Sequence, residues 1–245
     1  MKLHIHENSA QLTEAAAAFV GQQAQFCIRQ RGVCNLALSG GSTPLALYQH
    51  LAQVPLTQEI DWSRLHVFWS DERCVPPDHS ESNYHQAHDV LLRHVPIPAG
   101  NIHRLKGELV PAEAAEEANL TLAAHFGEAA LPIFDLILLG LGTDGHTASL
   151  FPGSEALKTS NQWVVANYVD QVAAWRLSFT YPLINAARNI VFLVSGEKKA
   201  AMAKEVIEER NPALPASRVQ PVAGELIWFL DAAAAQKLNR QSLSD

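Results

Sequence analysis

A glycine-rich segment carrying one histidine is the strongest candidate for catalysis in the sequence. It spans Gly140–Thr147 (GLGTDGHT) and directly follows an apolar run that ends at Leu139. Glycines let a ligand approach the backbone closely, and a histidine among them can act as a general base near neutral pH. The alternative is a helix-capping loop, in which Thr143 or Asp144 is the cap and His146 is merely solvated. The residue types alone leave both interpretations open.

A second candidate segment is suited to a phosphate. It lies between an apolar run and a helix that Pro44 would open, and it consists of Ser39, Gly40, Gly41, Ser42 and Thr43. Glycines expose backbone N–H groups at the helix start, the hydroxyls can donate as well, and the helix dipole favours an anion there. The segment matches neither the P-loop nor the GxGxxG fingerprint. A tight turn whose hydroxyls only cap the helix is the alternative.

Three cations are candidates for binding an anion. Arg73 follows Asp71 and Glu72 just after an apolar strand, so it either pairs locally with these acids or binds an anion. Lys199 lies in the first turn of a predicted helix, where a cation is unfavourable unless an anion is bound there too. Arg176 opens a later predicted strand.

The remaining reactive side chains predict no metal site and no nucleophile. Glu81, His85 and His88 have a helical ligand spacing without an evident fourth ligand. His4 and His6 alternate on one face of a possible edge strand, which favours a surface role. No Gly-x-Ser-x-Gly elbow is present, and no cysteine lies in the surroundings of a nucleophile.

The elements that must position these segments alternate along the chain. Apolar runs predict strands at 33–38, 65–69, 133–139, 176–180, 190–195 and 226–230. Helical patterns predict helices at 9–30 with Ser9 as N-cap, from Pro44 with Leu45, Tyr48 and Leu51 buried, and at 83–94, 111–127 and 197–209. This alternation predicts an α/β fold: one Rossmann-like domain over residues 1–245, with an open, mostly parallel sheet and helices on both faces.

Four polar segments directly follow predicted strands of that sheet: Ser39–Thr43, Ser70–Arg73, Gly140–His146 and Ser195–Lys199. In open α/β sheets, ligands bind beyond the carboxyl ends of the strands. We therefore expect these segments to converge along one edge and to form one site.

Composition limits the class of partner and the compartment. A net charge of −7 disfavours binding to nucleic acid or to an anionic membrane, because both need a basic surface. Three cysteines without a CxxC pair indicate reduced thiols. The N-terminus has no signal-peptide pattern, and no apolar stretch reaches about 18 residues. We expect a cytoplasmic protein with a small-molecule partner; its oligomeric state is not predictable.

Together these segments resemble the 6-phosphogluconolactonases of the glucosamine-6-phosphate isomerase/6-phosphogluconolactonase family. The matching stretches are SGGSTP (39–44), WSDERCVP (69–76), SNY (82–84), GLGTDGHTASLFP (140–152), Arg176, NAAR (185–188) and GEKKA (196–200). The resemblance implies lactone hydrolysis in the pentose phosphate pathway without metal or coenzyme. It further implies that His146 is the base, that Asp144 positions its loop, and that Arg73, Arg176, Lys199 and the Ser39–Thr43 turn bind the phosphate.

The same segments leave two other functions open. The related glucosamine-6-phosphate deaminase/isomerases typically carry an acidic residue just before the proline of the histidine segment, whereas this chain has Ser149-Leu150-Phe151-Pro152. Asp71 would still be available as their proton-abstracting base. A non-catalytic sugar-phosphate sensor is the second alternative, although related regulators carry a fused DNA-binding module for which the chain has no room.

Overall fold

The computed structural model describes residues 1–127 and 131–239, so positions 128–130 and 240–245 of the predicted domain lie outside the described residues. Its centre is a six-stranded parallel sheet, as predicted. Across the sheet, the strands are β1 (Lys2–His6), β9 (Glu225–Asp231), β8 (Asn189–Val194), β5 (Leu136–Leu139), β2 (Cys34–Leu38) and β3 (Leu65–Trp69). The possible strand at the N-terminus is indeed at one edge of this sheet, as β1.

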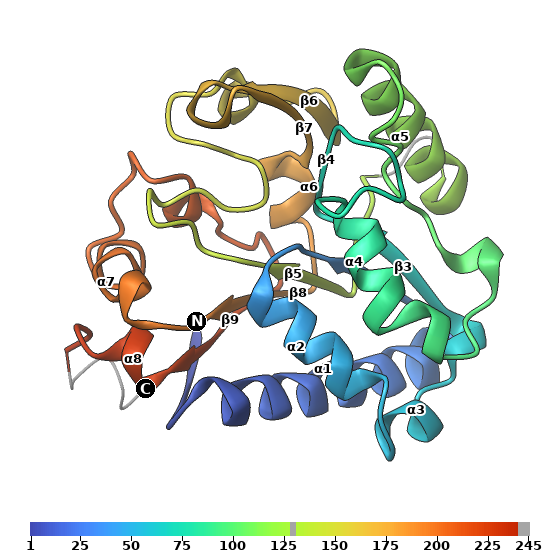
Figure 1. Cartoon of the computed structure of the whole chain (residues 1–245), viewed down its shortest axis with the longest axis horizontal. Coiled ribbons are helices and arrows are strands. Elements are labelled where there is room, and N and C mark those ends of the chain that lie inside the picture. The colour runs from blue at the N-terminus through green and yellow to red at the C-terminus, as the bar shows by residue number, and fades with distance from the viewer. Residues whose placement is uncertain (128–130, 240–245) are drawn as a thin grey trace.

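Helices cover both faces of the sheet, which explains why its central strands are almost entirely apolar. Every residue of β2 and β5 is buried. The helices are α1 (Ser9–Arg31), α2 (Ser42–Leu51), α3 (Leu56–Glu59), α4 (Asn83–Val90), α5 (Pro111–Phe126), α6 (Tyr181–Asn185), α7 (Ala200–Ile207) and α8 (Ala232–Ala235). In Figure 1, α1 lies below the sheet and α5 lies above it. No helix in the described ranges has the length and apolarity needed to cross a membrane.

Three details of the predicted helices were wrong. The N-cap of α1 is Asn8 rather than Ser9, because the Asn8 side chain accepts the Gln11 N–H at 3.0 Å. In α2, Leu45 is only partly buried, and Leu47 is fully buried instead. The predicted helix at 83–94 ends earlier, at Val90, and a separate 3-10 turn follows at Leu92–His94.

A second sheet was not predicted. It is antiparallel and consists of β4 (Asp71–Arg73), β7 (Ala174–Phe179) and β6 (Val164–Val169). The strand predicted at 176–180 therefore belongs to this small sheet, and residues 71–73 form a strand rather than a loop. Ser70 joins the two sheets: its N–H donates to the Leu38 carbonyl at 2.7 Å, and its own carbonyl accepts the Phe179 N–H at 2.8 Å. Figure 1 shows the small sheet above the carboxyl ends of the large one.

Candidate active site

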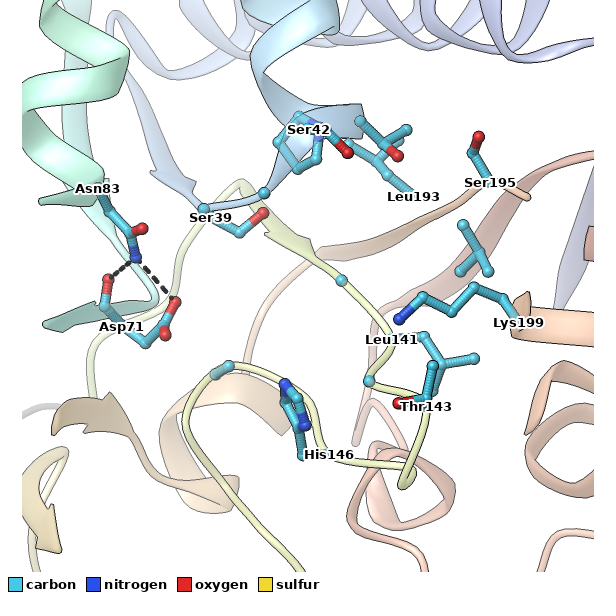
Figure 2. A pocket seen from close by; sticks show the side chains of 18 of the residues that line it. Ser39, Ser42, Asp71, Asn83, Leu141, Thr143, His146, Leu193, Ser195 and Lys199 are labelled. Atoms are coloured by element: carbon cyan, nitrogen blue, oxygen red, sulfur yellow. Dashed lines mark hydrogen bonds between the residues drawn. The ribbon is translucent and has the colours of Figure 1, made fainter. Parts of the chain in front are cut away.

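The four polar segments meet at a cavity of about 320 Å³ beyond the carboxyl ends of β2, β3, β5 and β8. This volume is in the range of small-molecule sites. Of the predicted site residues, the cavity is lined by Ser39, Gly40, Gly41, Ser42, Thr43, Asp71, Arg73, His146 and Lys199. Figure 2 shows Ser39 and Ser42 on one side, His146 facing them, and Asp71 and Lys199 at the flanks. Asp144 and Arg176 are not among the lining residues.

The serine–glycine turn leaves a helix start open toward the cavity. Gly41 precedes α2 with a φ of 110°, which favours glycine, and no side chain caps the helix. The turn is anchored from behind by Tyr48, whose hydroxyl accepts the Ser39 N–H at 2.9 Å and donates to the Ser39 carbonyl at 2.8 Å. The Ser39 hydroxyl is buried without a hydrogen-bond partner in the described structure. Uncapped N–H groups and this free hydroxyl suit an anionic, oxygen-rich ligand.

Gly40 is needed because Asn83 packs directly against it. A Cβ at position 40 would overlap the Asn83 carboxamide. The Asn83 amide donates to the Asp71 carbonyl at 2.9 Å and lies 3.4 Å from the Asp71 carboxylate. The other Asp71 oxygen accepts the Ser149 hydroxyl at 2.7 Å. Asp71 is therefore a buried carboxylate, held rigidly at the cavity wall.

Glu72 has a structural role. Its carboxylate lies at the N-terminus of α4, where it accepts the N–H groups of Asn83 and Tyr84 at 2.7 and 2.8 Å and the Ser82 hydroxyl at 3.0 Å. Burial raises the pKa of Glu72, and these hydrogen bonds partly oppose the rise. Glu72 Oε1 also accepts the Arg73 backbone N–H at 2.8 Å, and the side chain is only 2% exposed. Glu72 therefore holds the start of α4 and the backbone at Arg73 in place and is not available to a ligand.

The local ion pair considered for Arg73 does not form. Among the described residues Arg73 has no carboxylate within 4 Å, and its guanidinium instead donates to the Glu81 carbonyl at 2.5 Å. Arg176 is its antiparallel partner on β7. Burial lowers the pKa of Arg176, and the charge of Arg73 lowers it further. Two guanidinium groups without a paired carboxylate within 4 Å therefore lie close together here, and they favour an anion bound nearby.

Lys199 reaches the cavity from the opposite flank. It ends a 3-10 turn (Glu197–Lys199) and is the N-cap residue of α7. Burial lowers the pKa of Lys199, while the nearby Asp144 opposes this effect. A half-buried cation at a helix N-terminus is electrostatically unfavourable by itself, and an anion bound beside it would offset this cost.

Asp144 orients the ring of His146. The His146 Nδ1 lies 2.6 Å from the Asp144 Oδ1, which also accepts the His146 backbone N–H at 3.2 Å. A carboxylate accepts only, so Nδ1 carries the proton and Nε2 keeps its lone pair. Burial opposes ionisation of Asp144, but the His146 charge and these hydrogen bonds outweigh it and lower the pKa of Asp144. Phe151, which sequence reasoning missed, stacks on the ring at 4.1 Å.

Gly142 and Gly145 of the histidine loop are each required for a different structural reason. A Cβ at Gly142 would overlap both His146 Nδ1 and Asp144 Oδ1. Gly145 has a φ of 82°, and its carbonyl accepts the Ala216 N–H at 2.9 Å. Within the loop, the Gly142 N–H donates to the His146 carbonyl at 2.8 Å. The loop is therefore rigid, and it is not the helix-capping loop that sequence analysis considered as the alternative.

Two polar residues of the site were not predicted. Asn83 lines the cavity, and the Ser149 hydroxyl donates to the Asp71 carboxylate. Thr143 and Ser195 also line the cavity, and both belong to segments that were expected there. Asn83 and Ser149 lie within stretches that carried the family resemblance, but their side-chain roles depend on tertiary contacts. The spacing of Glu81, His85 and His88 does not produce a metal cluster in the described structure; His85 and His88 instead lie beside Asp89, at 3.5 and 3.7 Å.

Comparison with known proteins agrees with this architecture. Residues 7–228 match the family model of glucosamine-6-phosphate isomerases/6-phosphogluconolactonase. The chain is 43% identical over 236 residues to a 6-phosphogluconolactonase of Synechocystis, covering 94% of this chain and 95% of that protein. A Haemophilus influenzae 6-phosphogluconolactonase is 40% identical over 206 residues, covering 83% and 87% of the two chains.

Solved structures agree as well. The 6-phosphogluconolactonase structure from Trypanosoma brucei superposes with a TM-score of 0.87 at 29% identity, covering 97% of this chain and 98% of that one. A monomeric glucosamine-6-phosphate deaminase, at 21% identity and a TM-score of 0.80, shares the fold alone. By sequence and by fold, the chain belongs to the glucosamine-6-phosphate isomerase/6-phosphogluconolactonase family.

Proposed function

We propose that this protein hydrolyses 6-phospho-D-glucono-1,5-lactone to 6-phospho-D-gluconate. The observation that carries the proposal is the arrangement of one cavity with a histidine–aspartate pair on one side and an uncapped helix start with flanking cations on the other. The histidine–aspartate pair provides a base, and the helix start with its cations provides a binding site for a phosphate. Relatives of this chain over most of its length are named 6-phosphogluconolactonase.

The phosphate would bind at the Ser39–Thr43 turn, between Arg73 and Lys199, with Arg176 strengthening the positive potential behind Arg73. These contacts persist from the bound substrate to the transition state, so they mainly increase affinity. They also fix the lactone ring relative to His146, and such positioning lowers the entropic part of the barrier.

The chemical step needs one water and one base. His146 Nε2 takes a proton from the water as its oxygen attacks the lactone carbonyl carbon, while Asp144 stabilises the resulting imidazolium. When the tetrahedral intermediate collapses, the bond from the carbonyl carbon to the ring oxygen breaks. The imidazolium returns its proton to that oxygen, which becomes the free hydroxyl of the product. Because a lactone is an activated ester, this step requires no metal ion or coenzyme.

A backbone donor for the oxyanion is available in the same loop. Of the N–H groups of residues 142–145, those of Gly142 and Gly145 donate within the loop. Asp144 does not line the cavity, whereas Thr143 does, and the Thr143 N–H has no acceptor among the described residues. We assign the oxyanion contact to the Thr143 N–H.

We further propose that the whole chain is one catalytic domain and that it acts in the cytoplasm. All three cysteines are free thiols, and two of them are buried, as suits a reducing compartment. A sugar phosphate lactone is the expected small-molecule partner, and the acidic net charge supports neither nucleic acid nor a membrane as a second one.

The deciding experiment is hydrolysis of freshly generated 6-phosphogluconolactone, followed against its spontaneous rate in the presence of EDTA. Acceleration that survives EDTA and is lost in His146→Ala supports a metal-free, histidine-dependent lactonase. If the protein does not accelerate lactone hydrolysis but converts glucosamine-6-phosphate, it is a deaminase/isomerase, with Asp71 as the base. Binding of the sugar phosphate without any turnover would identify a sensor.

A further inference from the structure

Three histidines that are distant in the sequence lie together outside the candidate active site. His66 is on β3, His103 follows a 3-10 turn (Ala99–Asn101), and His125 is in the last turn of α5. The backbone N–H of His103 donates to the Val67 carbonyl at 2.8 Å, which fixes this loop against β3. None of the three lines the cavity at His146. All three are partly exposed, so an ion can reach them from solvent.

The rings are arranged as the ligands of one metal ion would be. Their centroids are 5.3 Å apart for His66 and His103, 4.6 Å for His66 and His125, and 5.0 Å for His103 and His125. Nitrogens bound at about 2.0–2.1 Å to a tetrahedral zinc lie roughly 3.3 Å apart, with ring centroids roughly 5 Å apart. Here His66 Nδ1 and His103 Nε2 are 3.0 Å apart, and one ligand atom from each histidine lies within 4.8 Å of the others.

A buried partner orients one of these rings. His125 Nε2 lies 2.8 Å from the Asn35 Oδ1, and this oxygen only accepts, so Nε2 carries the proton. The lone pair of His125 is therefore on Nδ1, where a metal ion could use it. Histidine ligands of metals commonly donate their second N–H to such an acceptor, which fixes both ring orientation and tautomer.

The other ring neighbours of the cluster are apolar. Phe68 stacks on His103 at 4.3 Å, and Phe126 lies edge-on to His125 at 4.8 Å. Among the described residues, no lysine or arginine takes part in the ring contacts of the three histidines.

We propose that His66, His103 and His125 bind one divalent transition-metal ion, with Zn²⁺ as the ion and water completing its coordination. Imidazole nitrogens are preferred ligands of zinc, and three of them with an open position form a stable site. On binding, the His66–His103 hydrogen bond is replaced: the donor of that pair moves its proton to its other ring nitrogen, and both facing nitrogens coordinate the ion. The site is independent of the lactonase chemistry.

The test is Zn²⁺ titration of untagged, EDTA-treated full-length protein in competition with a chromophoric chelator. We expect one ion per chain in the parent. His103→Phe keeps the ring that stacks on Phe68 but removes the ligand nitrogen, and it should weaken Zn²⁺ binding by about 100-fold or more. Asn35→Leu should weaken it by about 10- to 100-fold, because the ring of His125 is no longer oriented.

Two controls locate the ion. His146→Ala, at the candidate active site, and the double variant His85→Ala/His88→Ala should both retain the parent's affinity. Co²⁺ in place of Zn²⁺ should give the visible absorption of a tetrahedral site in the parent and not in His103→Phe. The proposal is overturned if the parent binds no ion stoichiometrically, or if binding survives His103→Phe and disappears in either control variant. Lactonase turnover should be the same in the parent and in His103→Phe.

Discussion

Arg73 and Arg176 are directly opposite each other on β4 and β7, although they lie far apart in the sequence. Side chains at such paired positions project from the same face of a sheet and lie close together, and like charges there are destabilising. Neither guanidinium has a carboxylate within 4 Å among the described residues, and each donates only to a backbone carbonyl, of Glu81 and of Trp175. The small antiparallel sheet therefore holds two cations without a paired carboxylate, Arg73 lining the cavity and Arg176 opposite it on the neighbouring strand, which suits a dianionic phosphate.

Removal of Arg73 should act on substrate binding. We expect Arg73→Ala to raise KM by roughly 10- to 100-fold, since a hydrogen bond to a charged group contributes about 1.5–3 kcal/mol. The kcat should change little, because the phosphate contact is the same in ground and transition states. Arg176→Ala should raise KM less, as Arg176 is not among the cavity-lining residues. Steady-state kinetics check this, with the exposed Arg93→Ala as control; a defect confined to kcat would place Arg73 at the reacting carbon instead.

Substitution of His146, the proposed base, should lower the turnover number. We expect His146→Ala to lower kcat by about 10²–10⁴-fold with KM nearly unchanged. Asp144→Ala should also lower kcat, because His146 Nδ1 then loses the acceptor that keeps the lone pair on His146 Nε2. Initial rates corrected for spontaneous hydrolysis measure both effects. A His146→Ala protein that turns over like the parent would exclude this histidine as the base.

The close approach of Gly142 to the histidine–aspartate pair gives a steric test. In Gly142→Ala, the new Cβ overlaps His146 Nδ1 and Asp144 Oδ1, so the pair must move and kcat should fall by about tenfold or more. Gly100→Ala is the matched control, because a Cβ there meets nothing within 4 Å. Kinetics and thermal unfolding of both variants check the prediction. Equal kcat in the two variants would mean that the position of the pair is not critical.

The three-histidine cluster makes stability depend on pH. The pKa of His103 is lowered from 6.5 to about 4, so between these values the unfolded chain binds more protons than the folded one. Stability should therefore be complete above pH 6.5 and should decrease as the pH falls toward 4. Urea unfolding midpoints with EDTA, measured between pH 4.5 and 7.5, should show this decrease in the parent and a smaller one in His103→Phe. Parallel pH profiles of the two proteins would contradict it.

The sequence by itself determined the parallel sheet, most helices and the four polar segments. Their signals are local: continuous apolar runs mark strands covered on both faces, and glycines with hydroxyls mark the turns that follow. Because the carboxyl ends of parallel strands lie at one edge, this information was sufficient to bring Ser39–Thr43, Arg73, His146 and Lys199 to one cavity.

Only the tertiary structure decided which distant residues became neighbours. Strand β7 has the apolar pattern of a sheet strand, but the pattern does not encode its partners, so its place beside β4 and the meeting of Arg176 with Arg73 were not predictable. The same holds for the Asn83–Asp71 contact and for the cluster of His66, His103 and His125. Local sequence specifies which faces are buried. Which distant segments pair with one another depends instead on the free-energy minimum of the whole chain, to which all packing and hydrogen bonding contribute.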